Sequence, residues 1–65
     1  MNINVNGEPH EVTALNVAEV LIELGYGEAH VATALNGDFI PSNQRAESTL
    51  TPDCKLEILA PMQGG

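Results

Sequence analysis

Residues 16–25 read NVAEVLIELG and carry the clearest local pattern of the 65-residue chain. Asn16 can accept a backbone hydrogen bond as the N-cap of a helix, and Glu19, three residues later, completes a capping-box pattern. The apolar stripe that follows has the i, i+3, i+4, i+7 spacing of a helix and consists of Val17, Val20, Leu21 and Leu24. Gly25 is the expected left-handed terminator. These residues predict a helix of about eight to nine residues that begins at Val17.

A hairpin is predicted before this helix. Ile3 and Val5 alternate with asparagines, and the pair Asn6-Gly7 that follows favours a tight two-residue turn. We expect the returning strand to run from about His10 to Thr13, with Pro9 near its start or on an edge of the sheet.

A second hairpin is predicted after the helix. Residues 31–36 are apolar and small at odd and even positions alike, as expected for a strand inside a sheet. Asn36-Gly37 marks another tight turn. Phe39 and Ile40 return from that turn, and Pro41 ends the strand.

The last third of the chain contains one more strand. Residues 42–49 have no strong periodicity and predict a loop or a short helical turn, after which Leu50 is expected in the core. Residues 55–59, KLEIL, predict a final strand whose Leu56 and Ile58 face inward. Cys54 shares their parity and is expected to point inward as well.

The predicted order of strand, strand, helix, strand, strand, strand is that of an α+β domain. One helix of this length covers only one face of the sheet and leaves the other open to solvent or to a partner. Ile22 lies off the apolar stripe, and we expect it to pack at the margin of the core rather than to form a contact surface. Residues 1–60 are predicted to form the folded domain, and residues 61–65 a flexible C-terminal tail.

The composition excludes several classes of protein. With 43% hydrophobic and 17% charged residues, the chain is too apolar for intrinsic disorder, yet it has no apolar run long enough to span a bilayer. Its formal charge of −7 argues against nucleic acid and anionic membranes as partners. The charge favours a partner with a basic protein surface. The alternative is that the charge serves only to keep the protein soluble. Because the first residues show no secretory signal, we expect a cytoplasmic protein.

The sequence lacks the parts of a catalytic or metal site. Gly25-Tyr26-Gly27 is neither preceded by a strand nor followed by the Gly-Lys-Ser/Thr of a phosphate-binding loop. His10 and His30 are separated by the whole helix, and the single cysteine cannot form a zinc cluster. We therefore expect no bound cofactor, no metal and no catalytic activity of the chain's own.

The final pair Gly64-Gly65 is the candidate for chemistry. Two residues without Cβ can enter a slot too narrow for side chains and carry a free α-carboxylate to its end. A carboxylate becomes an acyl donor only after activation, for instance as an acyl-adenylate made with ATP, which makes the tail the substrate of another enzyme. The alternative is a frayed end whose glycines are incidental.

Taken together, several segments resemble the ThiS family, the sulfur carrier proteins of thiamine biosynthesis. The resemblance rests on the opening hairpin, the capped helix start at residues 16–21, LNGxFIP at residues 35–41, LEIL at residues 56–59 and QGG at residues 63–65. It implies a ubiquitin-like β-grasp fold, with a mixed sheet of four to five strands and one main helix packed on one face.

The resemblance also implies partners and a role for the tail. Gly65 would be adenylated by an E1-like adenylyltransferase of the ThiF type that uses ATP and Mg. It would then become a thiocarboxylate with sulfur from a donor enzyme, and thiazole synthase of the ThiG type would receive this sulfur. Gly64 would give a slim approach, while Met62 and Gln63 would line the entry to the partner's channel.

Two positions depart from the family pattern, and several alternatives stay open. Ser42 stands where members tend to have a basic residue, and Asp53 stands where a turn glycine is usual. The small subunit of molybdopterin synthase is similar and also ends in Gly-Gly, but it is usually longer. Carriers for other sulfur pathways share the same motifs. A different class is an acidic protein-binding module in which the glycines play no part.

Overall fold

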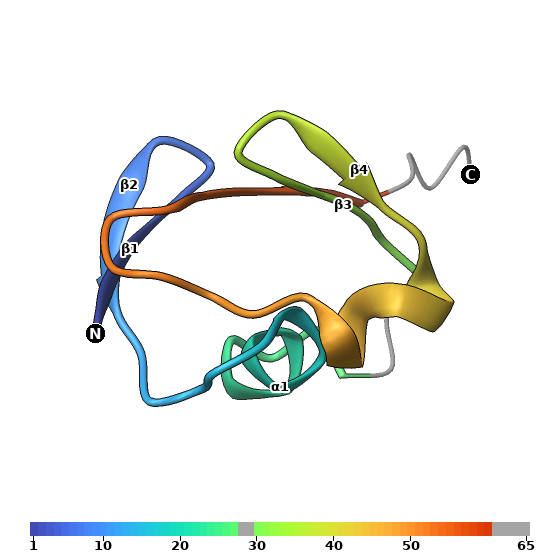
Figure 1. Ribbon diagram of the computed structural model, residues 1–65, viewed down its shortest axis with the longest axis horizontal. Helices are drawn as coiled ribbons and strands as arrows, with labels where there is room; N and C mark the ends of the chain where they lie inside the picture. The colour runs from blue at the N-terminus through green and yellow to red at the C-terminus, as the bar shows by residue number, and fades with distance from the viewer. Residues whose placement is uncertain (28–29, 61–65) are drawn as a thin grey trace.

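The computed structural model describes residues 1–27 and 30–60. Its elements are β1 (Asn2–Val5), β2 (Glu8–Glu11), α1 (Val17–Glu23), β3 (Ala32–Leu35), β4 (Asp38–Ile40), the 3-10 helix η1 (Ser42–Glu47) and β5 (Lys55–Leu59). The strands form one sheet in the order β2-β1-β5-β3-β4, in which β1 and β5 are parallel and the other neighbours antiparallel. Helix α1 lies on one side of this sheet (Figure 1). The mixed sheet with one main helix confirms the predicted α+β class.

Both Asn-Gly pairs form the predicted hairpin turns. Asn6 and Gly7 have φ angles of 52° and 85°, and Asn36 and Gly37 have φ angles of 51° and 89°. Positive φ at both central residues is the signature of the type I′ turn, whose twist matches that of the flanking strands. Asparagine and glycine adopt this conformation more readily than other residues, which explains why the two pairs could be recognised in the sequence.

The returning strand of the first hairpin begins two residues before the predicted His10–Thr13. The two-residue turn places Val5 directly opposite Glu8, so β2 begins at Glu8 and ends at Glu11. The predicted bounds were therefore wrong, whereas the predicted place of Pro9 is confirmed. β2 is an edge strand, where a residue without an N–H group is tolerated.

The side chain of Asn16 caps α1 as predicted. Its Oδ1 atom accepts the backbone N–H of Glu19 at 2.8 Å. The return contact of the predicted capping box is displaced by one residue, because the Glu19 carboxylate accepts from the amide of Leu15 at 3.4 Å rather than from that of Asn16. Asn16 instead forms an isolated β-bridge with Thr49, which ties the start of the helix to the segment that precedes β5.

The exposed face of α1 differs from the prediction at one residue. The helix is 7 residues long, slightly shorter than expected, and Gly25 follows it with the predicted positive φ of 94°. Its buried residues are Val17, Val20 and Leu21. Ile22 is 69% exposed, so the expected packing at the core margin was wrong. Successive helical residues are rotated by about 100°, which turns Ile22 away from the stripe that faces the sheet.

The core lies between α1 and the inner face of the sheet. Leu56 and Ile58 of β5 are buried in it, and so are Leu50 and Cys54 from the segment before β5, all as predicted. The other buried hydrophobic residues are Ile3, Val5, Val12, Ala14, Val17, Val20 and Leu21.

The predicted short helical turn is η1, and an arginine connects it to the second hairpin. The guanidinium of Arg45 donates to the carbonyl of Val31 and, at 3.2 Å, to Oγ1 of Thr33. The hydroxyl of Thr33 in turn donates to the carbonyl of Ile40 at 3.0 Å. This chain of hydrogen bonds ties the β3-β4 hairpin to η1.

Candidate functional site

Strand β5 leads to the predicted reactive tail. It is the central strand of the sheet, with β1 on one side and β3 on the other, and it ends at Leu59. The predicted site residues Met62, Gln63, Gly64 and Gly65 lie outside the described residues. Among the described residues, the site therefore consists of the strand from which the tail departs and the surface around that strand.

Alternation along β5 divides its side chains between the two faces of the sheet. Leu56 and Ile58 are buried beneath α1, whereas Lys55, Glu57 and Leu59 are exposed on the face opposite the helix. No described residue of a helix packs on that second face, which we call the open face (Figure 1). This agrees with the expectation that a single helix covers only one side.

An apolar patch lies on the open face beside the end of β5. We call it the open-face patch; it consists of Ala32, Ala34, Phe39 and Leu59. Phe39 is 67% exposed and Leu59 is 72% exposed. The strand register places Ala34 opposite Phe39 and Ala32 opposite Leu59, so the four side chains are neighbours. They line a shallow groove of about 430 Å³, whose other walls include Asn6 and Glu57.

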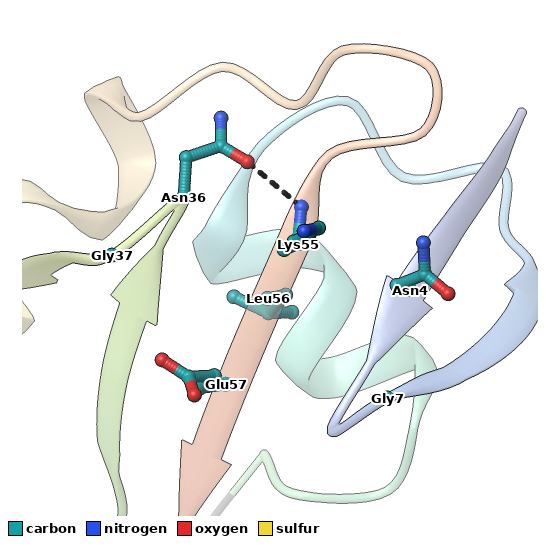
Figure 2. A pocket seen from close by; sticks show the side chains of 7 residues that line it. All are labelled: Asn4, Gly7, Asn36, Gly37, Lys55, Leu56 and Glu57. Carbon is teal, nitrogen blue, oxygen red and sulfur yellow. Dashed lines mark hydrogen bonds between the residues drawn. The ribbon is translucent and has the colours of Figure 1, made fainter.

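The other half of the open face is polar. A groove of about 620 Å³ lies between the tips of the two hairpins and is lined by Asn4, Gly7, Asn36, Gly37, Lys55, Leu56 and Glu57 (Figure 2). Lys55, at the start of β5, is one of the two basic residues of the chain. The open face therefore carries its apolar surface near the tail and its positive charge at the opposite end of β5.

The two turn asparagines bind the backbone of β5 through their side chains. Oδ1 of Asn36 accepts the N–H of Lys55 at 2.8 Å, as Figure 2 shows. Oδ1 of Asn6 accepts the N–H of Ile58 at 2.8 Å, and its Nδ2 atom donates to the carbonyl of the same residue at 3.1 Å. Sequence reasoning assigned these asparagines only to turns. Nothing local reveals the second role, because Asn6 and Ile58 are 52 residues apart.

Asp53, one of the two residues that depart from the family pattern, still forms the turn before β5. Asp53 has a φ of 65°, which lies in the left-handed region. In the family that the sequence resembles, a glycine is usual at this position. Its N–H donates to the carbonyl of Asn2 at 2.8 Å. The aspartate therefore keeps the geometry of the turn and takes on the strain that glycine would avoid. Ser42, the other departure, is the first residue of η1.

Glu23 forms a hydrogen-bonded cluster on the helix side of the molecule. Its carboxylate accepts the backbone N–H of Thr13 at 3.0 Å, the N–H of Ala14 at 2.9 Å and the hydroxyl of Thr13 at 3.1 Å. These bonds, the one from the Thr13 backbone foremost, lower the pKa of Glu23 below its usual value because they favour the charged form. The cluster fixes the segment between β2 and α1 and lies away from the open face.

Residues 1–27 and 30–60 contain neither a metal-binding cluster nor a membrane-spanning helix. No three His, Cys, Asp or Glu side chains of this part come together as a metal site requires. No helix of the described segments is long and apolar enough to cross a membrane. Cys54, predicted to be structural, is a buried free thiol.

The chain is similar to known proteins over its whole length. Residues 3–65 match the model of the ThiS family. A crystal structure of a thiamine biosynthesis protein (ThiS) from Geobacter metallireducens is 35% identical and has a TM-score of 0.83, and the match covers 100% of both chains. An NMR solution structure of a thiamine biosynthesis protein from the same organism is 33% identical with a TM-score of 0.82, covering 100% of this chain and 88% of that one. Among curated proteins, none matches this chain. The likeness to these structures confirms the expected ubiquitin-like β-grasp fold.

Proposed function

Because the chain belongs to the ThiS family, we propose that it is a sulfur carrier protein whose last glycine takes up sulfur and delivers it for thiazole formation in thiamine biosynthesis. The proposal rests above all on one observation: the family match extends to residue 65 and so includes the Gly64-Gly65 pair. In this role the protein is a substrate of its partner enzymes and needs no catalytic groups of its own.

The first chemical step activates Gly65. An oxygen of its carboxylate attacks the α-phosphorus of ATP, pyrophosphate leaves, and an acyl-adenylate forms. We assign this step to an E1-like adenylyltransferase of the ThiF type. Mg and basic side chains of that enzyme would neutralise the anions that the reaction brings together.

Sulfur enters in the second step. Sulfide supplied by a donor enzyme attacks the carbonyl carbon of the adenylate, AMP leaves, and a thiocarboxylate remains on Gly65. The exchange of AMP for sulfide changes no oxidation state, so the step needs no further reagent. Thiazole synthase of the ThiG type is the proposed acceptor of this sulfur.

The tail alone is a poor ligand for such partners. Residues 60–65, fully extended, reach about 20 Å, enough to bring Gly65 into a channel whose entry Met62 and Gln63 would line. Fixing the backbone of these residues costs about 1 to 2 kcal/mol each, or about 6 to 12 kcal/mol together. Most of the binding free energy must therefore come from the folded domain.

The open-face patch is the surface best suited to supply it. Phe39 and Leu59 expose most of their apolar area in the free protein, and Leu59 is the last residue of β5. An enzyme that covers this patch therefore reaches the root of the tail at the same time. The formal charge of −7 favours a basic rim around the contact on the enzyme.

Intact-mass measurement tests the proposal. The protein is incubated with its host's activating enzyme, ATP, Mg and a sulfide source, and the expected product is heavier by the difference between one sulfur and one oxygen atom. Omission of ATP, or one residue appended after Gly65, should abolish the change. An acidic binding module would instead keep its affinity with the appended residue and show no new mass. An unchanged mass, with an enzyme that activates another carrier, would refute the proposal.

A further inference from the structure

The parallel pairing of β1 with β5 stops before β5 ends. Its register runs through Asn4 opposite Lys55 and Val5 opposite Leu56, after which β1 turns away at Asn6-Gly7. β5 continues to Leu59. Among residues 1–27 and 30–60, the backbone of Ile58 would thus have no strand partner on the β1 side, although β3 pairs with it on the other side through Thr33.

The side chain of Asn6 takes the place of the missing strand. The backbone amide of Asn4 donates to the carbonyl of Cys54 at 2.9 Å, and that of Asn6 donates to the carbonyl of Leu56 at 2.9 Å. The next carbonyl of this series, that of Ile58, is bound by Nδ2 of Asn6 at 3.1 Å. The N–H of Ile58 donates to Oδ1 of the same carboxamide at 2.8 Å. A carboxamide has the donor and the acceptor of a peptide group, so it extends the ladder by one step.

We propose that Asn6 is a positioning residue for the tail, fixing through its two bonds to Ile58 the end of β5 from which residues 59–65 enter the active site of the activating enzyme. The inference rests on the function proposed above and adds to it a residue far from the tail in sequence. Asn6 touches no reacting atom; it acts through the backbone of Ile58.

The position of Ile58 matters because the tail is long. The seven residues after Ile58 would span about 23 Å when extended, so a tilt of about 10° at their base displaces the far end by about 4 Å. We call the two bonds between Asn6 and Ile58 the clamp. Without the clamp, the end of β5 must be ordered when the enzyme binds, which raises KM. Once Gly65 is in the channel, the enzyme holds it in the same place whether or not the clamp exists, so kcat should not change.

The chain offers a matched control at its second turn. Asn36 has nearly the same backbone conformation as Asn6 and also binds β5 through its side chain, but at Lys55, the end remote from the tail. Glycine fits both positions without strain, because both have positive φ. Asn6→Gly and Asn36→Gly thus remove the same group from the same turn type, one near the tail and one far from it.

The test measures ATP-pyrophosphate exchange by the activating enzyme at several carrier concentrations, at a temperature where circular dichroism shows every variant folded. Asn6→Gly should raise KM about fivefold, the factor that corresponds to ordering one additional residue, and leave kcat unchanged. Asn36→Gly should change neither constant by as much as about twofold. Amide exchange gives a second readout without the enzyme: Ile58 should exchange about tenfold faster in Asn6→Gly, and Lys55 in Asn36→Gly.

Each outcome decides between the possibilities. Equal rises in KM for both variants would show general loosening of the domain and overturn the positioning role, and so would an unchanged KM in Asn6→Gly. Unchanged exchange of Ile58 in that variant would show that the clamp does not hold the strand, and would also overturn the inference. Failure of the wild-type protein to be activated would refute the proposed function and the role of Asn6 with it, while the exchange rates would still establish whether the clamp exists.

Discussion

Replacing Phe39 by alanine should weaken binding to the activating enzyme by about 2 to 3 kcal/mol. An aromatic side chain presents roughly 200 Å² of surface, and Phe39 is 67% exposed. A partner that covers the open-face patch therefore removes about 130 Å² from water, worth about 3 kcal/mol at about 25 cal/mol per Å². Alanine keeps a small part of this area, so the dissociation constant should rise about 30- to 150-fold.

The same substitution has a smaller effect on the fold. The covered third of the Phe39 side chain corresponds to about 70 Å², so the free energy of unfolding should fall by at most about 1.5 kcal/mol. In a domain of this size such a loss lowers the melting temperature by about 6 to 12 °C. Binding is therefore compared at a temperature well below the transition of the variant, where both proteins are folded.

Isothermal titration calorimetry, with the carrier titrated into the activating enzyme, measures the change in the dissociation constant. Ile22→Ala is the control. Ile22 is 69% exposed, as open to solvent as Phe39, but it belongs to α1 on the opposite side of the sheet. Its truncation should leave the dissociation constant unchanged. If Ile22→Ala weakened binding and Phe39→Ala did not, the enzyme would dock on the helix side, and the assignment of the open-face patch would be wrong.

Three further predictions concern single residues. Asp53→Gly should raise the free energy of unfolding in urea by about 0.5 to 1 kcal/mol, because glycine relieves the left-handed strain at a smaller entropic cost; a loss of stability would contradict this account. The pKa of Glu23 is lowered from its ordinary value of 4.5. Its bonds to Thr13 therefore stabilise the fold fully at pH values above 4.5, and this stabilisation is lost as the pH falls through the lowered pKa. The melting temperature of the wild type should thus exceed that of Glu23→Gln near neutral pH, and the gap should close in acid; a constant gap would exclude the linkage. Deamidation, in which the glycine nitrogen attacks the preceding carboxamide and ammonia leaves, should occur at Asn36 before Asn6, because two bonds hold the Asn6 carboxamide and one exposed bond holds that of Asn36. Peptide mapping of aged protein checks the order, and earlier loss at Asn6 would contradict it.

The elements that were predicted from the sequence are those with local causes. Asn16 caps the helix within one turn, and the Asn-Gly pairs form their turns because of their own backbone preferences. The bounds of β2 were missed even though the Asn6-Gly7 turn was predicted correctly. The register of a two-residue turn decides the pairing, and Val12 contributes to the core from beyond the strand.

The parts of the site that were missed depend on pairing between distant segments. Parity indicated that one face of β5 points outward, but the open-face patch requires the register that places Ala32 beside Leu59 and Ala34 beside Phe39. The contact between Asn6 and Ile58 requires the first and last strands to be neighbours. Neither arrangement has a signal within a short window of sequence, whereas the predicted Gly64-Gly65 site can be read directly from the sequence.

The central position of β5 gives a physical reason for the strand order. Parallel pairing with β1 brings the last strand of the chain into the middle of the sheet, where β1 and β3 flank it. Strands paired on both sides open only with much of the domain, whereas edge strands fray at lower free energy. Every residue that frays has to be ordered again when a partner binds, at about 1 to 2 kcal/mol, or a factor of about 5 to 30 in affinity. A tail that departs from a central strand, with Asn6 extending the ladder to Ile58, therefore confines this cost to the residues that must enter the enzyme.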